Sequence, residues 1–488
     1  MSSNLKLKDG IKSESPEKIQ TRCSRHPGRI NGAGFRGVGP MMVWLAAATT
    51  CWAADWPQFG GSHRAFTSQE TGLARSWPAD GPKLLWKIPL HSGFAGAAVR
   101  DGEVFLFDQA DDQEVLLCLD MGTGKELWRF ADTAPNKIGP AGTRATPAVD
   151  QDYVFICGTT GHLNCLDRKT HKVVWQANLV KDFDGVVPLW GVAQNPALWK
   201  NLVIVAPQGR KGGIVAFERN TGRVAWRSPY VTGMITGSWE GSYISPALTE
   251  IDGTPQAIMA TAHGPKGDND AWTTRGLVAG ISLIDGSLLW TYDGWQSEIP
   301  IAAPVPVGNG RVFITAAYGG GSAMLRIAKA GDKFTATEVF TTTECGAQIQ
   351  QPIIYQDHLY VVSNGKEHNE GLMCLTLGGE VKWHTTKSRF CAKAEPNLPN
   401  FECGNILLAD GLLFAVDGKR GDLYLIEPTP RGYRQLACAK KMLDEKGDGQ
   451  IWAPMALSQG KLLLRDQQQM KCVDVANSSG TGVPRLQP

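Results

Sequence analysis

The sequence has 488 residues, of which 20% are charged, and a formal net charge of +2. A charge this near to zero argues against the basic surface of a nucleic-acid-binding protein and against an acidic, solvated tail. With 56 glycines, 28 prolines and 16 tryptophans, the composition indicates a turn-rich, aromatic-rich globular protein with enough apolar material for a core.

Residues 1–54 are predicted to be a basic N-terminal region followed by a signal peptide. Basic residues dominate the first 40 positions, and the apolar run MMVWLAAATTCWAADW follows them. This run is too short to span a bilayer and passes into small residues near Ala53 and Ala54, as a secretory signal requires. We therefore expect export to the periplasm or cell surface, with no transmembrane segment left after cleavage. The alternative is a disordered tail that carries a chance apolar patch.

The stretch CLDMGTGKELW, from Cys118 to Trp128, contains a Gly-Lys pair that needs interpretation. A phosphate-binding loop requires a glycine five positions before that pair and a Ser or Thr after the lysine. Leu119 and Glu126 occupy those positions. Because alternating apolar residues flank it, we interpret GTGK as the turn of a β-hairpin.

The same pattern recurs along the chain, each time with a second hairpin upstream of it. Its copies end at Trp175, Trp226, Trp290 and Trp383. Four antiparallel strands repeating about every 40 to 65 residues are typical of a propeller blade. Eight blades are predicted, near residues 94–130, 143–178, 192–228, 240–292, 301–340, 348–384, 401–438 and 452–475.

The last predicted blade has only three strands, whereas PKLLWKIPL near the N-terminus has a Trp-bearing strand and no blade. We expect this strand, with Trp86, to complete the eighth blade and hide two sheet edges. The predicted fold is therefore all-β, an eight-bladed β-propeller of four-stranded antiparallel blades, with the ring closed by an N-terminal strand. Its domain organisation is a lead-in segment over 55–82, the propeller over 83–476 and a C-terminal tail over 477–488.

The repeated tryptophans are expected to lie between neighbouring blades, each burying on the order of 200 Å² of apolar area, rather than to stack on a ligand. Blade five has Phe340 at the equivalent place. Four of the eleven cysteines recur at one strand position, which predicts small buried residues rather than reactive ones: Cys118, Cys165, Cys374 and Cys472. A disulfide could join Cys391 to Cys403, and another could join Cys157 to Cys165.

At these repeats the chain after Asp55 resembles the pyrroloquinoline-quinone-type repeat family. The motif L-x-C-L-D-x-x-T-G-K-x-x-W is clearest at Leu116–Trp128, with a near copy at Leu163–Trp175. The family comprises eight-bladed propellers found in quinoprotein alcohol dehydrogenases and in the propeller lipoprotein of the outer-membrane barrel-assembly machine. The likeness is greatest to exported quinone-repeat or polyvinyl-alcohol-dehydrogenase-like proteins.

The resemblance implies particular residues for a dehydrogenase. Such family members bind their quinone on the propeller axis with a calcium ion, use an Asp as the base and commonly carry two adjacent, bridged cysteines. This sequence has no adjacent cysteine pair, and we match no residue to the calcium ligands or the catalytic Asp. We therefore assign no catalytic residue and no metal ligand. The cofactor stays open, with pyrroloquinoline quinone and calcium as the candidate.

Candidate ligand-binding residues lie just before the proline of each blade, because the loops leading into the innermost strands converge at the mouth of the central channel. These polar and aromatic residues are Arg144, Trp190, Gln194, Asn195, Glu240, Tyr243, Gln348, Gln350, Glu402 and Trp452. Their alternative interpretation is a water-filled channel whose polar residues only satisfy strand ends.

The predicted function is that of an exported binding or scaffold module of the cell envelope. Its expected partner is a protein, a glycan or a small polar ligand at a propeller face, with no nucleic acid, and the chain is expected to be a monomer. The first alternative is a quinone-dependent alcohol dehydrogenase that uses the axial channel. A second is an outer-membrane assembly factor that pairs a strand edge with another chain.

Overall fold

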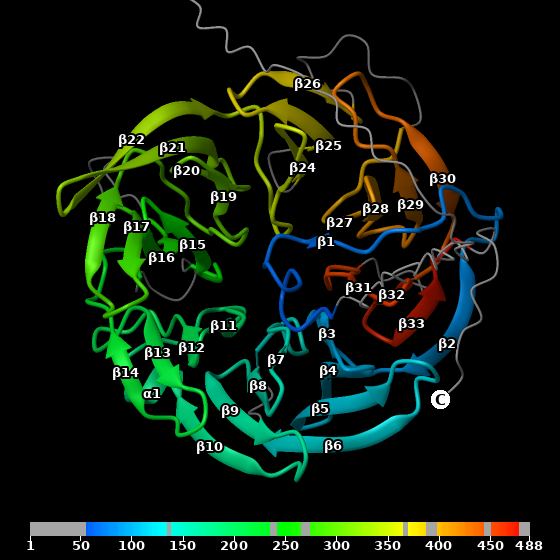
Figure 1. The fold of residues 1–488 in the computed structure, drawn as a ribbon, viewed down its shortest axis with the longest axis horizontal. Coiled ribbons are helices and arrows are strands. Elements are labelled where there is room, and N and C mark those ends of the chain that lie inside the picture. The colour runs from blue at the N-terminus through cyan, green and yellow to red at the C-terminus, as the bar shows by residue number, and fades with distance from the viewer. Residues whose placement is uncertain are drawn as a thin grey trace, which may run out of the picture. The chain divides into compact units, whose positions relative to one another are not determined.

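Eight sheets, each with four blade strands, follow one another around a central axis (Figure 1). The computed structural model describes residues 55–133, 138–234, 242–264, 274–364, 369–386, 398–443 and 450–477. The predicted signal peptide and nearly all of the predicted C-terminal tail lie outside these ranges. The described residues belong to one unit, Cys51–Pro488. Within them, we find no helix with the length and apolar character needed to cross a bilayer.

We number the blades in chain order. Blade 1 contains β3 (Ala97–Arg100), β4 (Glu103–Ala110), β5 (Gln113–Asp120) and β6 (Glu126–Thr133). Blade 2 contains β7 (Ala148–Val149), β8 (Tyr153–Cys157), β9 (His162–Asp167) and β10 (Val173–Asn178), followed by the short helix α1 (Leu179–Asp182). Blade 3 contains β11 (Ala197–Trp199), β12 (Leu202–Val205), β13 (Val215–Glu218) and β14 (Val224–Arg227). Blade 4 contains β15 (Ala247–Ile251), β16 (Thr254–Ala260), β17 (Val278–Ser282) and β18 (Leu288–Tyr292).

The second half of the ring repeats this arrangement. Blade 5 contains β19 (Val305–Gly308), β20 (Arg311–Ala316), β21 (Gly321–Ala330) and β22 (Lys333–Thr342). Blade 6 contains β23 (Ile353–Tyr355), β24 (His358–Asn364), β25 (Asn369–Thr376) and β26 (Val381–His384). Blade 7 contains β27 (Asn405–Ala409), β28 (Leu412–Val416), β29 (Leu423–Ile426) and β30 (Gln435–Ala439). Blade 8 contains β31 (Ala456–Ser458), β32 (Lys461–Arg465) and β33 (Gln469–Asp474).

The N-terminal strand β2 (Lys83–Pro89) completes blade 8. It pairs antiparallel with β33, and Trp86 lies opposite Cys472. The eight-bladed fold and its closure by an N-terminal strand are therefore confirmed. A buried ion pair joins blade 8 to blade 1, since Nη2 of Arg465 in blade 8 lies 3.0 Å from Oδ1 of Asp108 in blade 1.

A repeated contact joins successive blades. An indole N–H at the outer strand of one blade donates to a backbone carbonyl of the next blade, over 2.8–3.0 Å: Trp86 to Met121, Trp175 to Arg219, Trp226 to Leu283 and Trp383 to Thr429. For Trp86, Trp175 and Trp226 the indole also covers the glycine of the next blade's hairpin turn. A Cβ atom built on Gly222 would lie 2.7 Å from the ring of Trp175, and Gly222 has a φ of +69°. Only glycine combines that conformation with such close approach.

Two blades vary this contact. In blade 2 the turn residue is His171, whose ring stacks on Trp128 with centroids 4.5 Å apart. In blade 4 the Trp290 indole donates to Gln256 of its own blade. The predicted position between blades is thus confirmed for five of these six tryptophans: Trp86, Trp128, Trp175, Trp226 and Trp383. Trp290 is the exception.

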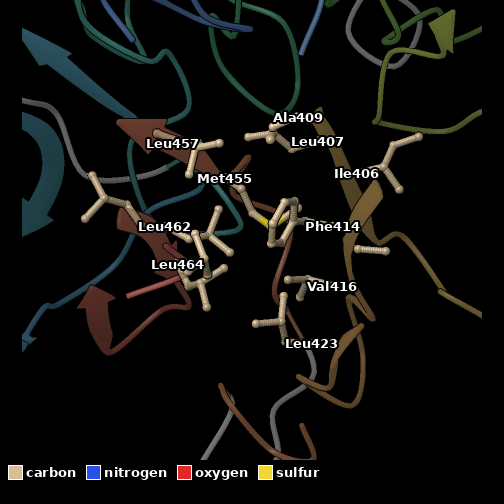
Figure 2. Close-up of a cluster of buried hydrophobic side chains, with 14 of the residues drawn as sticks. Ile406, Leu407, Ala409, Phe414, Val416, Leu423, Met455, Leu457, Leu462 and Leu464 are labelled. Atoms are coloured by element: carbon tan, nitrogen blue, oxygen red, sulfur yellow. The ribbon is translucent and has the colours of Figure 1, made fainter. Parts of the chain in front are cut away.

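Buried apolar side chains fill the space between the sheets in five clusters. Figure 2 shows one boundary, where Phe414 and Val416 of blade 7 face Met455 and Leu464 of blade 8. The four recurring cysteines are completely buried in such layers, as predicted.

The predicted Cys157–Cys165 disulfide is wrong, since both residues are buried free cysteines. Cys157 pairs with Leu163, whereas Cys165 pairs with Phe155. The two cysteines are therefore diagonal neighbours, too far apart for a disulfide, which favours residues directly opposite each other. The other predicted bridge is not tested, because Cys391 lies outside the described residues.

The lead-in segment crosses the centre of the ring, which the repeats did not predict. Its strand β1 (Thr67–Ser68) adds a fifth strand, parallel to β27, on the inner edge of blade 7 (Figure 1). Hydrogen bonds join residues 56–70 to blades 1, 2, 3, 4, 6, 7 and 8 through Val99, Val149, Leu198, Pro246, Gln351, Leu408 and Gly460. We call residues 56–70 the plug.

Replacing Trp226 by alanine is expected to destabilise the fold by about 3–5 kcal/mol, because it removes a buried ring and leaves a cavity between blades. Equilibrium denaturation measures this loss. Leu288→Ala is the control: Leu288 is also on an outer strand but is 43% exposed, so we expect a change below about 1 kcal/mol. Equal losses in the two variants would contradict the role given to the indole.

Replacing Asp108 by alanine is expected to cost about 3–5 kcal/mol, because it leaves Arg465 as an uncompensated buried charge. The Arg434–Glu427 pair provides the control, since its side chains are 61% and 34% exposed. We expect Glu427→Ala to cost about 0–1 kcal/mol. Thermal unfolding of both variants tests the difference, and a loss no larger in Asp108→Ala would show that the blade 8–blade 1 boundary does not depend on the pair.

Candidate ligand-binding site

A cavity of about 290 Å³ lies on the axis, where the loops lead into the innermost strands. Six of the ten predicted residues line it: Arg144, Trp190, Asn195, Tyr243, Gln348 and Trp452. These residues precede blades 2, 3, 4, 6 and 8, so the ring closure brings together positions far apart in the sequence.

The other four predicted residues do not contribute to the described lining. Gln194 and Gln350 are buried, and their amides donate to the backbone carbonyls of Ser242 and Gln351. Glu402 pairs with Lys419 at 3.3 Å. Glu240 lies outside the described residues.

Phe59, Phe94 and Tyr318 also line the cavity and were not predicted. Phe94 immediately precedes blade 1, so the rule used for the other blades could have found it. Tyr318 lies in the loop between β20 and β21, and Phe59 belongs to the plug. Neither of these two positions is marked by the blade repeat.

Aromatic rings form most of the wall. The rings of Phe94 and Trp452 are stacked, with centroids 5.2 Å apart. Those of Trp190 and Tyr243 have centroids 5.3 Å apart. Rings held in pairs by different blades offer flat apolar faces that suit a planar ligand.

Arg144 supplies the charge of the cavity. Its guanidinium donates to the carbonyls of Pro140 and Gly142 and lies 5.7 Å from the Phe94 ring centroid. Among the described residues it makes no ion pair with a carboxylate. Burial lowers the pKa of Arg144 to about 10, opposed by the more distant charge of Glu114. The group is therefore a cation at neutral pH whose charge is not neutralised by direct contact.

Two phenols add hydrogen-bond donors. The Tyr318 oxygen accepts from Nε2 of Gln348 at 2.8 Å, and the Tyr243 oxygen accepts from the Trp190 backbone N–H at 3.3 Å. Their hydroxyl hydrogens have no acceptor among the described residues. Burial raises the pKa of both Tyr243 and Tyr318, so both phenols stay protonated at neutral pH.

Asn195 has a structural task instead. Its Oδ1 accepts from the Thr146 N–H at 2.6 Å, and its own N–H and Nδ2 donate to Oγ of Ser245. Thr146 in turn accepts from the Gly96 N–H. Residues that precede the blade prolines thus link blades 1 to 4 in a chain. This observation supports the alternative prediction for Asn195, that a polar residue here satisfies strand ends.

The described lining fits part of a quinone cofactor with calcium. Flat aromatic faces and an unpaired guanidinium suit a planar organic anion. The described lining contains no carboxylate, and the described residues contain no cluster of three or more His, Cys, Asp or Glu side chains able to hold a metal. Because calcium prefers carboxylate and carbonyl oxygens, these residues do not fit the calcium ion.

The comparison with known families decides the classification. A family model described as outer membrane protein assembly factor BamB matches residues 43–258, 111–377 and 274–479. The chain belongs to this PQQ_2 family. The resemblance drawn from the repeat motif is thereby confirmed.

Relatives of this PQQ_2 chain include quinone-dependent enzymes. Quinohemoprotein alcohol dehydrogenase ADH IIB of Pseudomonas putida is 31% identical over 128 residues, 24% of this chain and 18% of that protein. The dehydrogenase subunit of alcohol dehydrogenase (quinone) from Komagataeibacter europaeus is 29% identical over 158 residues, 30% of this chain and 21% of that protein. The chain therefore matches about a fifth of each relative.

Solved structures agree on the fold of the PQQ_2 chain. Quinohemoprotein alcohol dehydrogenase from Comamonas testosteroni superposes with a TM-score of 0.57 at 13% identity, over 88% of this chain and 82% of that one. BamB from Moraxella catarrhalis gives 0.51 at 13% identity, over 80% and 100%. At such identities the likeness concerns the fold alone.

Proposed function

We propose that this protein binds a flat organic anion in the axial cavity and serves as a ligand-recognition module of the cell envelope. The observation that carries the proposal is the unpaired guanidinium of Arg144 in an aromatic-walled cavity. The basic N-terminus with its short apolar run supports the envelope location.

The groups at the cavity specify the chemistry of the ligand. Arg144 and the hydroxyls of Tyr243 and Tyr318 are all donors, and no carboxylate of the described residues competes for them. A ligand rich in acceptor oxygens, with at least one acidic group, therefore satisfies donors that would otherwise stay unpaired. Its flat part gains from contact with the stacked rings of Phe94 and Trp452. A small anion of this kind fits better than a neutral glycan, which lacks both the charge and the planar rings.

Quinone-dependent alcohol oxidation is the second candidate. It is favoured because the relatives named above are quinone-dependent alcohol dehydrogenases, and a quinone with acidic groups has the shape and charge described. Such a cofactor, when bound, would accept two electrons from the alcohol as hydride or its equivalent. Arg144 and the two phenols would hold its oxygens. The described lining supplies no carboxylate to act as a base, so we rank oxidation second.

A role in outer-membrane assembly, the activity named in the description of the matching family, remains a prediction. It needs an exposed strand edge that pairs with another chain. Unlike ligand binding, it would not depend on Arg144.

The proposal predicts that pyrroloquinoline quinone, used as a probe, binds saturably and changes tryptophan fluorescence through Trp190 and Trp452. Arg144→Gln should weaken binding about 10- to 100-fold, because it removes a charge-assisted hydrogen bond worth about 1.5–3 kcal/mol. Arg434→Gln is the matched control, since it removes the same charge from an exposed outer position. No saturable binding by the unmodified chain would refute the proposal. Calcium-dependent oxidation of alcohols, with a dye as the electron acceptor, would instead favour the second candidate, quinone-dependent alcohol oxidation.

The affinity for this probe should also depend on pH. Because burial lowers the pKa of Arg144 to about 10, the guanidinium carries its charge below that pH and loses it as the pH rises through it. Binding should therefore be nearly constant from about pH 7 to 9 and weaken through pH 10. Arg144→Gln should lack this alkaline fall, and an unchanged fall in the variant would assign it to other groups.

A further inference from the structure

A second cavity of about 290 Å³ lies further along the channel from the axial cavity. Ala303 lines both cavities. Residues of the plug contribute to each, Phe59 to the first and Arg64 to the second, and the Arg64 guanidinium lies 5.9 Å from the Phe59 ring centroid. The plug therefore stands between the two cavities.

Arg64 is a buried cation without a counter-ion. Arg64 is only 9% exposed. No carboxylate among the described residues forms an ion pair with it. Burial alone lowers the pKa of Arg64 to about 10, so the group is still charged at neutral pH. An unneutralised buried charge is costly, and proteins normally pair it or bind an ion beside it.

The hydrogen bonds of Arg64 leave part of its guanidinium unused. Nη1 donates to the Pro196 carbonyl at 3.2 Å and to Oε1 of Gln58 at 3.5 Å, and Nη2 donates to the Pro246 carbonyl at 3.5 Å. Nε–H and one N–H of Nη2 have no partner among the described residues. Nε, which has no partner, is not fully enclosed by protein atoms.

Nε and Nη2 lie on one edge of the guanidinium plane. This is the edge with which arginine holds an oxyanion through two parallel hydrogen bonds. The cavity that Arg64 borders contains no carboxylate in its described lining, and Thr67 is one of the lining residues. The described lining therefore brings no negative charge against an anion.

We propose that Arg64 binds a small inorganic oxyanion, of the size of sulfate or phosphate, in this second cavity. The ion would neutralise the buried guanidinium and so hold the plug against blades 3 and 4, whose carbonyls Arg64 already contacts. This site is independent of the ligand proposed for the axial cavity.

Sulfate serves as the probe in solution, exchanged against chloride at constant ionic strength. The expected result is a saturable rise in the Tm of the purified chain, about 2 °C at ten times the Kd. Arg64→Gln should lose the saturable rise, whereas Arg144→Gln should keep it. An equal rise in Arg64→Gln, or no saturable rise in the unmodified chain, would overturn the proposal.

A crystallographic measurement decides the matter even if Arg64→Gln does not fold. Crystals of the unmodified chain are soaked in selenate, which has the shape and charge of sulfate and a strong anomalous signal. An anomalous peak within hydrogen-bond distance of the Arg64 guanidinium would support the site. Peaks confined to the outer surface would refute it.

Discussion

An indole seated on the hairpin turn of the neighbouring blade is the contact on which this ring depends. It occurs at successive boundaries, and it explains why the turn residue is glycine, as at Gly222, where both the backbone conformation and the space exclude a side chain. The turn thus reverses its own strand and receives the ring of the previous blade. Because each blade is held by its neighbour, the loops at the axis are fixed relative to one another only when the whole ring is closed.

The fold could be predicted because its signal is repeated. The Trp-terminated hairpin identified the blades, and the unmatched strand around Trp86 identified the closure. The repeat says nothing about segments that lie outside it, so the plug and its ring Phe59 could not be found. The disulfide prediction for Cys157 and Cys165 failed for a different reason, since sequence spacing does not reveal strand register.

The site was predictable to the extent that it follows the repeat. Positions before the blade prolines converge on the axis, and most of the predicted residues reach the cavity there. Convergence does not decide what each side chain does. The side chain of Asn195 is hydrogen-bonded to its neighbours in blades 2 and 4, whereas the Arg144 guanidinium has no carboxylate among the described residues in direct contact with it. Only the hydrogen-bond partners separate these two cases.

A nearly neutral chain thus places two cations, Arg144 and Arg64, at the walls of the two cavities of its channel. Arg144 and Phe59 line the axial cavity, and Arg64, which contacts Phe59, lines the second. In these low-dielectric surroundings the field of each cation acts strongly within its cavity. The composition does not reveal these two cations, because basic and acidic residues nearly balance over the whole chain. The polarity of a propeller axis is set by a few buried residues rather than by the net charge.

The position of the plug also has a consequence for biosynthesis. The plug and β2 are the first parts of the described chain to be synthesised, yet β2 pairs with β33 and the plug bonds to blades 7 and 8. These partners leave the ribosome last. Contacts between such distant segments form slowly. The strand β2 therefore stays unpaired until β33 has been synthesised, and unpaired strand edges of this kind are prone to aggregation.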